Sequence, residues 1–166
     1  MKKLIDFKLE GIDAQGVEKT YTNKDFAGKK LVIYFYPKDN TPGCTKEACN
    51  FNVMLPKIMS FANIIGVSAD SIKSHKKFRE DHSLAFPLIS DPKLELANSL
   101  GATKELSNMN VMDIAMKLVM ETSEGKKMTR STFIIDEKGN VAKEWLSVKV
   151  DGHDNEVLKE LQNLSK

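Results

Sequence analysis

The chain of 166 residues contains two cysteines, Cys44 and Cys49. Cys44 follows the turn-forming run Thr41-Pro42-Gly43, where an apolar segment gives way to a sequence that favours a helix. A cysteine in the first turn of a helix faces backbone N–H groups that have no partner within the helix. These donors and the helix dipole favour the thiolate over the thiol. The sequence therefore predicts a reactive sulfur at Cys44.

Such a thiolate is stabilised further by a nearby cation, and the chain has two arginines, Arg79 and Arg130, among its 25 basic residues. Arg130 directly precedes the apolar segment 131–135, so we expect its guanidinium at the mouth of a sheet. There it can bind an anion without losing its charge. Arg79 has charged neighbours, which is typical of a solvent-exposed helix face. Because Glu47 opposes a nearby thiolate, we expect Arg130 to be the partner of the sulfur.

Thr41 and Pro42 suit a small substrate that contains an O–O bond. The hydroxyl of Thr41 can both donate and accept a hydrogen bond, and Pro42 offers a rigid apolar wall with no N–H group to compete. The same residues also make an ordinary turn, and taken alone this structural interpretation is the more common one.

Cys49 lies five residues after Cys44. On a regular helix this spacing gives a rise of about 7.5 Å and a rotation of about 140°, so the sulfurs point to different faces. A disulfide needs Cα atoms within about 7 Å, and the intervening turn must therefore unwind first. Asn50, Asn52 and Pro56 weaken the helix. Two interpretations stay open: a resolving thiol, or a small buried residue on the inner face.

Other chemistries have weaker support. The three histidines, His75, His82 and His153, are dispersed along the chain, whereas a structural zinc site needs four closely spaced ligands. The sequence has no Cys-x-x-Cys motif, which argues against an ordinary dithiol oxidoreductase. We expect no metal site.

The composition indicates one globular domain, residues 1–166, with 41% apolar and 29% charged residues. The net charge of +2 comes from scattered charges, so we expect neither nucleic acid nor a membrane as a partner. We interpret His75-Lys76-Lys77 as a solvated helix face. Charges at Asp6 and Lys8 interrupt any apolar core of a signal peptide, and we expect a cytoplasmic protein.

The apolar runs 31–36 and 62–68 predict buried central strands, and the second precedes a helix with Asp70 as its N-cap. A shorter strand is expected over 86–90, followed by a helix that Pro92 opens and that reaches Gly101. The last elements are a hairpin of strands 131–135 and 141–145, and an amphipathic helix over 154–164.

The N-terminal residues predict a small accessory hairpin with its turn between Gly11 and Gly16. Methionines at helical spacing predict a helix within 110–120, which either packs into the protein's own core or forms a surface for a partner. Alternating strands and helices followed by a hairpin and a helix predict an α/β fold. We expect a central mixed sheet flanked by helices on both faces.

The run YPKDNTPGCTKEAC, residues 36–49, resembles the active-site motif of the peroxiredoxins, and the second cysteine five residues on resembles their bacterioferritin comigratory protein or peroxiredoxin Q branch. Nearly the whole chain shares the likeness, except residues 103–129. The other segments that carry it are 66–71, 74–78, 86–91, 130–136 and 148–153. Pro56 departs from the family by falling where the active-site helix continues, so we expect a kinked or divided helix.

The resemblance implies a thioredoxin-like fold in which Cys44 is the peroxidatic thiol. It also implies that Pro37 and Pro42 shield this sulfur, and that Thr41 and Arg130 hydrogen-bond the peroxide and the sulfur. The implied enzyme reduces hydrogen peroxide and organic hydroperoxides through a cysteine sulfenic acid.

By the same resemblance, Glu47 helps to orient the arginine, and Cys49 resolves the sulfenic acid through an intramolecular disulfide. The implied reductant is thioredoxin or a similar dithiol protein. No metal or bound organic cofactor is implied, and we expect a monomer or weak dimer. An alternative from another class is a redox-sensing or chaperone-like binding protein with Cys44 as its switch, which predicts stoichiometric oxidation without turnover.

Overall fold

A computed structural model describes residues 2–105 and 125–166 of the chain. The methionine-rich helix expected within 110–120 lies outside the described residues. In the described part, no helix has both the length and the apolar character needed to cross a membrane.

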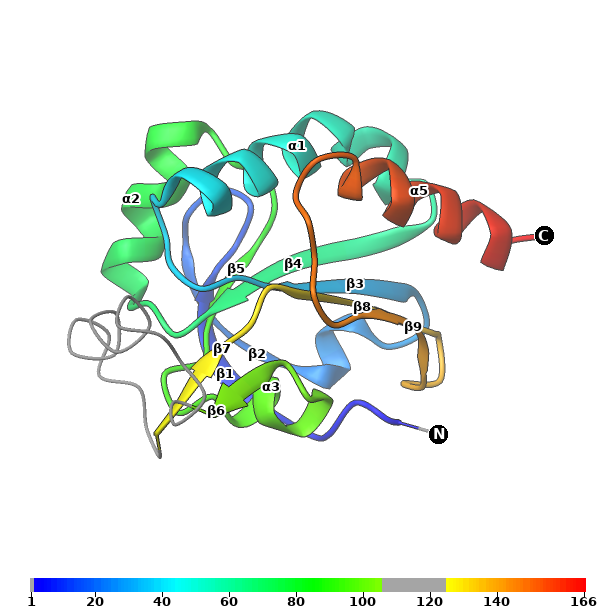
Figure 1. Cartoon of the computed structure of the whole chain (residues 1–166), viewed down its shortest axis with the longest axis horizontal. Helices are drawn as coiled ribbons and strands as arrows, with labels where there is room; N and C mark the ends of the chain where they lie inside the picture. Colours follow the sequence, from blue (N-terminus) through cyan, green and yellow to red (C-terminus); the bar gives the residue numbers. More distant parts are fainter. Residues whose placement is uncertain (1, 106–124) are drawn as a thin grey trace.

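The centre of the fold is a mixed sheet of seven strands in the order β2-β1-β5-β4-β3-β8-β9 (Figure 1). The strands are β1 (Lys8–Ile12), β2 (Glu18–Thr22), β3 (Lys30–Phe35), β4 (Ala62–Ser68), β5 (Leu88–Ser90), β8 (Ser131–Ile135) and β9 (Val141–Trp145). β3, β4 and β5 run parallel, whereas β8 is antiparallel to β3. A separate pair is formed by β6 (Thr103–Glu105) and β7 (Lys126–Met128).

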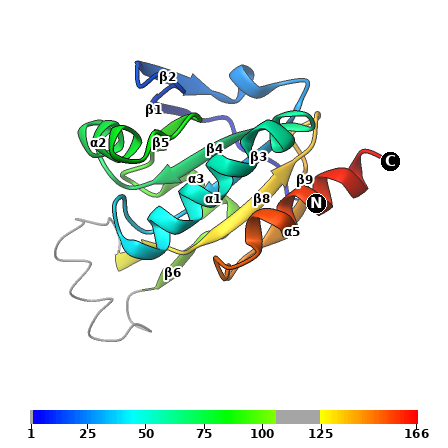
Figure 2. The same ribbon diagram turned by 90° about the horizontal axis from the view of Figure 1, so that it is seen from above.

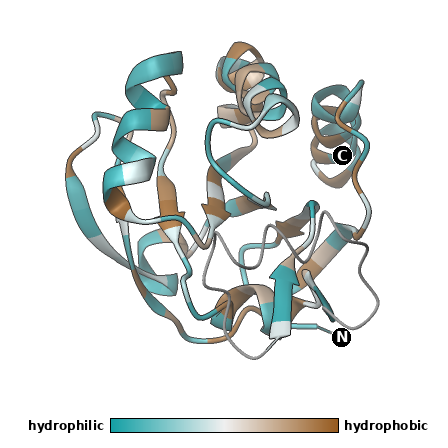
Figure 3. Cartoon of the chain, turned by 60° about the vertical axis from the view of Figure 1, so that its left-hand side comes forward, coloured by the Kyte–Doolittle hydropathy of each residue, from teal (hydrophilic) through white to brown (hydrophobic). Residues whose placement is uncertain are grey.

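Helices lie on both faces of this sheet, as the sequence predicts. α1 (Pro42–Met59), α2 (Ile72–His82) and α5 (His153–Leu164) lie on one face, and α3 (Glu95–Leu100) lies on the other (Figures 1 and 2). A short 3-10 helix, η1 (Asn23–Phe26), links β2 to β3. The helices turn their hydrophobic sides toward the sheet, and hydrophilic colour dominates their outer sides (Figure 3).

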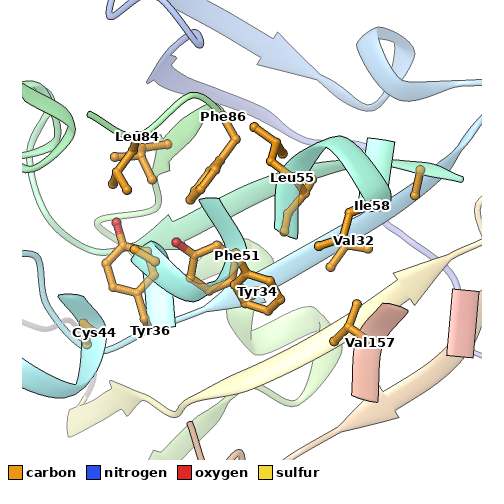
Figure 4. Close-up of a cluster of buried hydrophobic side chains, with 14 of the residues drawn as sticks. Val32, Tyr34, Tyr36, Cys44, Phe51, Leu55, Ile58, Leu84, Phe86 and Val157 are labelled. Atoms are coloured by element: carbon orange, nitrogen blue, oxygen red, sulfur yellow. The ribbon is translucent and has the colours of Figure 1, made fainter. Parts of the chain in front are cut away.

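Alternate residues of β3 contribute to the two cores. Val32 and Tyr34 pack under α1 and α5, and Leu31 and Ile33 pack on the opposite face. This alternation follows from the two-residue period of a strand. The cluster under α1 extends from Val32 to Tyr36 and Cys44, so the sulfur lies at the end of a continuous apolar core (Figure 4).

Trp145, the only tryptophan of the chain, lies at the α5 side of this core. Its ring meets His153 edge-on with 5.3 Å between centroids, and His153 meets Phe51 of α1 edge-on at 5.9 Å. His153 also hydrogen-bonds Thr132 Oγ1 through Nε2 at 2.8 Å. Burial lowers the pKa of His153, although Glu156 acts in the opposite direction. The ring is therefore neutral at neutral pH.

The N-terminal hairpin is confirmed, but it is no accessory unit, because β1 pairs with β5 and extends the main sheet. α2 begins one residue later than predicted: Ser71 is its N-cap, and its hydroxyl accepts from Ser74 N. Pro92 does not open α3, which begins at Glu95 after Leu94 in a left-handed conformation. Here Asp91 caps the helix by accepting from Glu95 N and Ala97 N.

α1 runs without a break to Met59, so it is not divided at Pro56, and the alternative of a kink stays a prediction. Packing against the sheet and α5 outweighs the hydrogen bond that this proline removes. The hairpin of β8 and β9 and the C-terminal helix are confirmed. The prediction of a single domain over 1–166 stays a prediction.

Close packing of Tyr34 over Gly66 gives a first prediction. The two residues pair across β3 and β4, and a Cβ atom at Gly66 would lie 2.9 Å from the Tyr34 ring. We expect Gly66→Ala to lower the free energy of unfolding by about 1–3 kcal/mol, because the buried ring must shift. Urea unfolding of the reduced protein measures this change. Asn63→Ala on the same strand is the control, and an equal loss in both variants would refute the packing argument.

Candidate active site

Cys44 lies at the N-terminal end of α1. Thr41 is the N-cap, Pro42 occupies the first helical position, and Thr45 N makes the first helical hydrogen bond to Thr41 O at 2.8 Å. The amides of Gly43 and Cys44 precede this bond and lie at the positive end of the helix dipole. Cys44 is only 1% exposed, so this field acts on its sulfur in an environment with little water.

Arg130 connects the sulfur to Glu47. Its Nη2 donates to Cys44 Sγ at 3.4 Å, and its Nη1 donates to Glu47 Oε1 at 2.9 Å. Burial lowers the pKa of Arg130, but the charges of Cys44 and Glu47 outweigh it and raise the pKa. The guanidinium is therefore a permanent cation beside the sulfur.

Gly43 makes this approach possible. A Cβ atom at position 43 would lie only 3.1 Å from Arg130 Nη2, closer than a side chain normally packs. The glycine of the turn thus leaves space for the guanidinium over the first turn of α1. Chain topology brings the arginine here, because β8 pairs with β3 from Ser131 opposite Phe35 onward.

Glu47 is a buried carboxyl group, 2% exposed. Burial raises its pKa from 4.5 to about 7, and the ion pair with Arg130 acts in the opposite direction. Its Oε2 and the hydroxyl of Tyr34 have no hydrogen-bond partner among the described residues. The negative charge of Glu47 also contributes to raising the pKa of Tyr34, after burial, which is the largest cause. Glu47 therefore exchanges its proton near neutral pH.

Thr41 does not cap α1 with its side chain. Its Oγ1 instead donates to Lys38 O at 2.9 Å, which commits its only proton. The lone pairs of Oγ1 stay available as acceptors. Near the sulfur the chain thus offers an acceptor oxygen on Thr41 and donor groups on Arg130.

A cleft of about 360 Å³ reaches Arg130, the residue that contacts the sulfur, whereas Cys44 and Thr41 themselves do not line it. Pro37 and Arg130 line it together with Leu146 and Val148. Pro42, exposed at the start of α1 next to Thr41, does not line this cleft. Of the two prolines that the resemblance places around the sulfur, Pro37 borders the cleft.

Cys49 lies on the same helix as Cys44, and both thiols are free. Cys49 is half-buried, so it is neither a core residue nor fully accessible. α1 is regular across both positions, which separates the sulfurs onto different sides of the helix, as the sequence predicts.

Sequence reasoning missed a buried polar cluster beside the site. His75 is 0% exposed, so its assignment to a solvated face is wrong, although Lys76 and Lys77 are exposed. Its Nδ1 lies 2.7 Å from Asp39 Oδ2, and its Nε2 lies 3.1 Å from Ile89 O. Arg79 is also more than a surface charge, because it donates to Ala14 O in the β1–β2 turn.

Asp39, Asp70 and His75 have the residue types of a metal site. The ring nitrogens of His75 lie at hydrogen-bonding distance from Asp39 Oδ2 and Ile89 O, so a metal ion would have to displace the bond to Asp39. The cluster fits hydrogen bonding instead. A sequence signal did exist: Tyr36, Asp39 and Ser68 lie at the carboxyl ends of two neighbouring parallel strands, where side chains converge.

The geometry agrees with comparisons to known proteins. The family model of the AhpC/TSA family matches residues 1–144. Peroxiredoxin Bcp of Bacillus subtilis is 39% identical over 99% of this chain and 95% of its own length. Peroxiredoxin Bcp of Xanthomonas campestris is 40% identical over 85% of this chain and 81% of its own.

Solved structures give the same result. A crystal structure of a Xylella fastidiosa PrxQ mutant superposes with a TM-score of 0.82 at 33% identity, covering 98% of this chain and 92% of that one. The bacterioferritin comigratory protein of Xanthomonas campestris, in a study of its alkyl peroxide reduction activity, gives 0.79 at 37% identity over 95% and 92%.

The fold and the relatives place this chain among the thiol-dependent peroxidases with a thioredoxin-like fold. The fold class and the enzyme class predicted from the sequence are therefore confirmed. The chain belongs to the AhpC/TSA family, and its relatives are Bcp and peroxiredoxin Q proteins. It is thus a peroxiredoxin, an enzyme that uses a peroxide substrate and a thiol reductant.

Burial of Glu47 predicts a pH-dependent stability. Its folded pKa of about 7 lies above its ordinary value of 4.5, so the native state holds this proton more tightly than the unfolded chain. The resulting stabilisation is complete below about pH 4.5 and is lost as pH rises through about 7. Glu47→Gln lacks this titrating group. As pH rises from about 4.5 to about 7, we expect its unfolding free energy to rise relative to that of wild type by up to roughly 3 kcal/mol.

Urea unfolding of both reduced proteins at several pH values from 5 to 8 measures this difference. Asp81→Asn, which changes an exposed carboxyl group, is the control. Parallel pH profiles for wild type and Glu47→Gln would contradict the assignment.

Proposed function

We propose that Cys44 is the peroxidatic thiol of a peroxidase that reduces hydrogen peroxide and organic hydroperoxides. The observation that carries this proposal is the 3.4 Å contact between Arg130 Nη2 and the sulfur at the start of α1. The alkyl peroxide reduction reported for the Xanthomonas campestris relative supports the inclusion of organic hydroperoxides.

In the first step the Cys44 thiolate attacks the terminal oxygen of ROOH along the O–O axis. An S–O bond forms and the O–O bond breaks, so the sulfur is oxidised to a sulfenic acid and the peroxide is reduced to ROH. The proton of the attacked hydroperoxide group and one proton from solvent or the site complete Cys–SOH and ROH. No other oxidant or reductant enters this step.

Charge moves from the sulfur to the leaving oxygen during this attack. Arg130 and the amides of Gly43 and Cys44 can donate to that charge, and Thr41 Oγ1 can accept from the peroxide O–H group. Stabilisation of the transition state is essential, because a thiolate loses nucleophilicity as its basicity falls.

In the second step the thiol of Cys49 attacks the sulfenic sulfur, which forms the disulfide and releases water. The first turns of α1 must unwind for the two sulfurs to meet. Lys46 and Asp151 form an exposed ion pair across this segment, and such pairs contribute little to stability. Unwinding can stop before Asn52, whose side chain donates to Ser83 O at 3.1 Å and accepts from Ala85 N at 2.8 Å.

In the third step a dithiol reductant, thioredoxin or a similar protein, attacks the disulfide and restores both thiols. The proposed cycle needs no metal and no bound organic cofactor, because the two cysteines and the external dithiol transfer all the electrons. We propose a cytoplasmic enzyme that acts as a monomer or weak dimer.

Intact mass after one equivalent of hydrogen peroxide tests the roles of the two cysteines. We expect wild type to lose two hydrogens, and Cys49→Ser to gain one oxygen that dimedone can trap. Cys44→Ser should show no oxidation at this dose and a loss of peroxidase turnover of at least about 10³-fold. Circular dichroism establishes that each variant is folded.

A stable oxygen adduct on both wild type and Cys49→Ser would make this a one-cysteine enzyme. Retained thiol-dependent turnover by Cys44→Ser would refute the assignment of Cys44. Steady-state assays with thioredoxin and its reductase test the recycling step, because a redox sensor would be oxidised once without sustained peroxide consumption.

A further inference from the structure

The peptide group between Lys38 and Asp39 lies between a carboxylate and the threonine of the site. On one side, Asp39 N donates to Asp70 Oδ2 at 2.8 Å. On the other side, Lys38 O accepts from Thr41 Oγ1 at 2.9 Å. Since a peptide unit is planar and rigid, the acceptor that fixes its N–H also fixes the direction of its carbonyl oxygen. Asp70 therefore acts on Thr41 through one peptide plane.

Asp70 is itself held in place at the carboxyl ends of β4 and β5. Ser68 Oγ donates to Asp70 Oδ2 at 2.6 Å, and Ser90 Oγ donates to the backbone oxygen of Asp70 at 2.6 Å. Burial, and then the charge of Asp39, raise the pKa of Asp70. Its Oδ2 is thus a fixed acceptor in a partly buried place.

The loop around this peptide has little freedom to adjust. Asp39 accepts from Tyr36 OH at 2.6 Å and Ser74 Oγ at 2.8 Å, and it also bonds to His75 Nδ1. The next residue, Asn40, has a left-handed φ of 58°, which costs a non-glycine residue about 1 kcal/mol or more. Such a conformation persists only where its surroundings hold it.

The direction of Lys38 O decides between two states of Thr41. A threonine at an N-cap ordinarily turns Oγ1 toward the helix and accepts from an amide of the first turn. That bond would consume both a lone pair of Thr41 and an amide beside Cys44. Here the hydroxyl bonds to Lys38 O instead, and no capping bond is made by the side chain.

We propose that Asp70 is a positioning residue of the peroxidase: it holds the Lys38–Asp39 peptide so that Thr41 stays out of the capping conformation and presents its lone pairs to the peroxide. This inference rests on the proposed function of Cys44. Asp70 touches neither the sulfur nor the substrate in this arrangement and acts only through Thr41.

A double-mutant cycle tests whether Asp70 acts through Thr41. The rate constant for oxidation of Cys44 by hydrogen peroxide is measured by stopped flow in wild type, Asp70→Ala, Thr41→Val and the double variant. We expect Asp70→Ala to slow oxidation by about tenfold, as for loss of one well-placed hydrogen bond. In the Thr41→Val background the same substitution should have almost no further effect.

Asp70→Asn and Asp91→Ala are the matched comparisons. Asp70→Asn keeps an oxygen that can accept from Asp39 N, so it should recover most of the lost rate. Asp91 is a buried carboxyl group that, like Asp70, accepts from backbone amides, but it caps α3 on the other face of the sheet. We expect Asp91→Ala to lose stability without slowing the oxidation of Cys44.

A second readout does not depend on activity. Scalar couplings by NMR report the χ1 angle of Thr41 in reduced wild type and Asp70→Ala, and we expect a change to the capping rotamer in the variant. An unchanged rotamer, additive rate losses or an equal slowing by Asp91→Ala would overturn the inference. Failure of wild-type Cys44 to react with peroxide would instead refute the proposed function, and the rotamer measurement keeps the two failures distinct.

Discussion

The site depends on one interaction, the placement of a permanent cation beside a buried sulfur. A thiolate in an environment with little water is costly unless a charge of opposite sign or fixed donors lie close to it. Arg130 supplies that charge at 3.4 Å, and the helix end supplies donors from the other side. The attraction also acts on the arginine, because the charges of Cys44 and Glu47 raise the pKa of Arg130.

The sheet order explains how distant parts of the chain meet at this point. Cys44 follows β3, and Arg130 precedes β8. These two strands are neighbours in the sheet, although more than eighty residues separate Cys44 from Arg130 in the sequence. Because these two strands are antiparallel, the end of β3 and the start of β8 share one edge of the sheet. Gly43 then allows the guanidinium to come close.

Much of this arrangement is predictable from residue types. Cys44 in a first helical turn, Thr41 beside it and the isolated Arg130 all have chemistry that can be recognised without coordinates. The burial of His75 is not visible in the run His-Lys-Lys, because the orientation of α2 against β5 decides which residue of the three faces inward. The unbroken course of α1 past Pro56 likewise depends on tertiary packing rather than on local preference.

The link from Asp70 to Thr41 is of another kind, since it passes through a backbone peptide. Side-chain identities carry no information about which way a loop carbonyl points. The hydrogen bonds around Asp39 fix it, and they join the loop after β3 to α2.

The contact of Trp145 with His153, and of His153 with Phe51, couples the lone indole to the helix that carries both cysteines. A charged imidazole quenches the fluorescence of an indole more strongly than an uncharged one. The emission of Trp145 therefore depends on the protonation state of His153. Two ring contacts thus join the indole to α1, and its emission can be followed without attaching a dye.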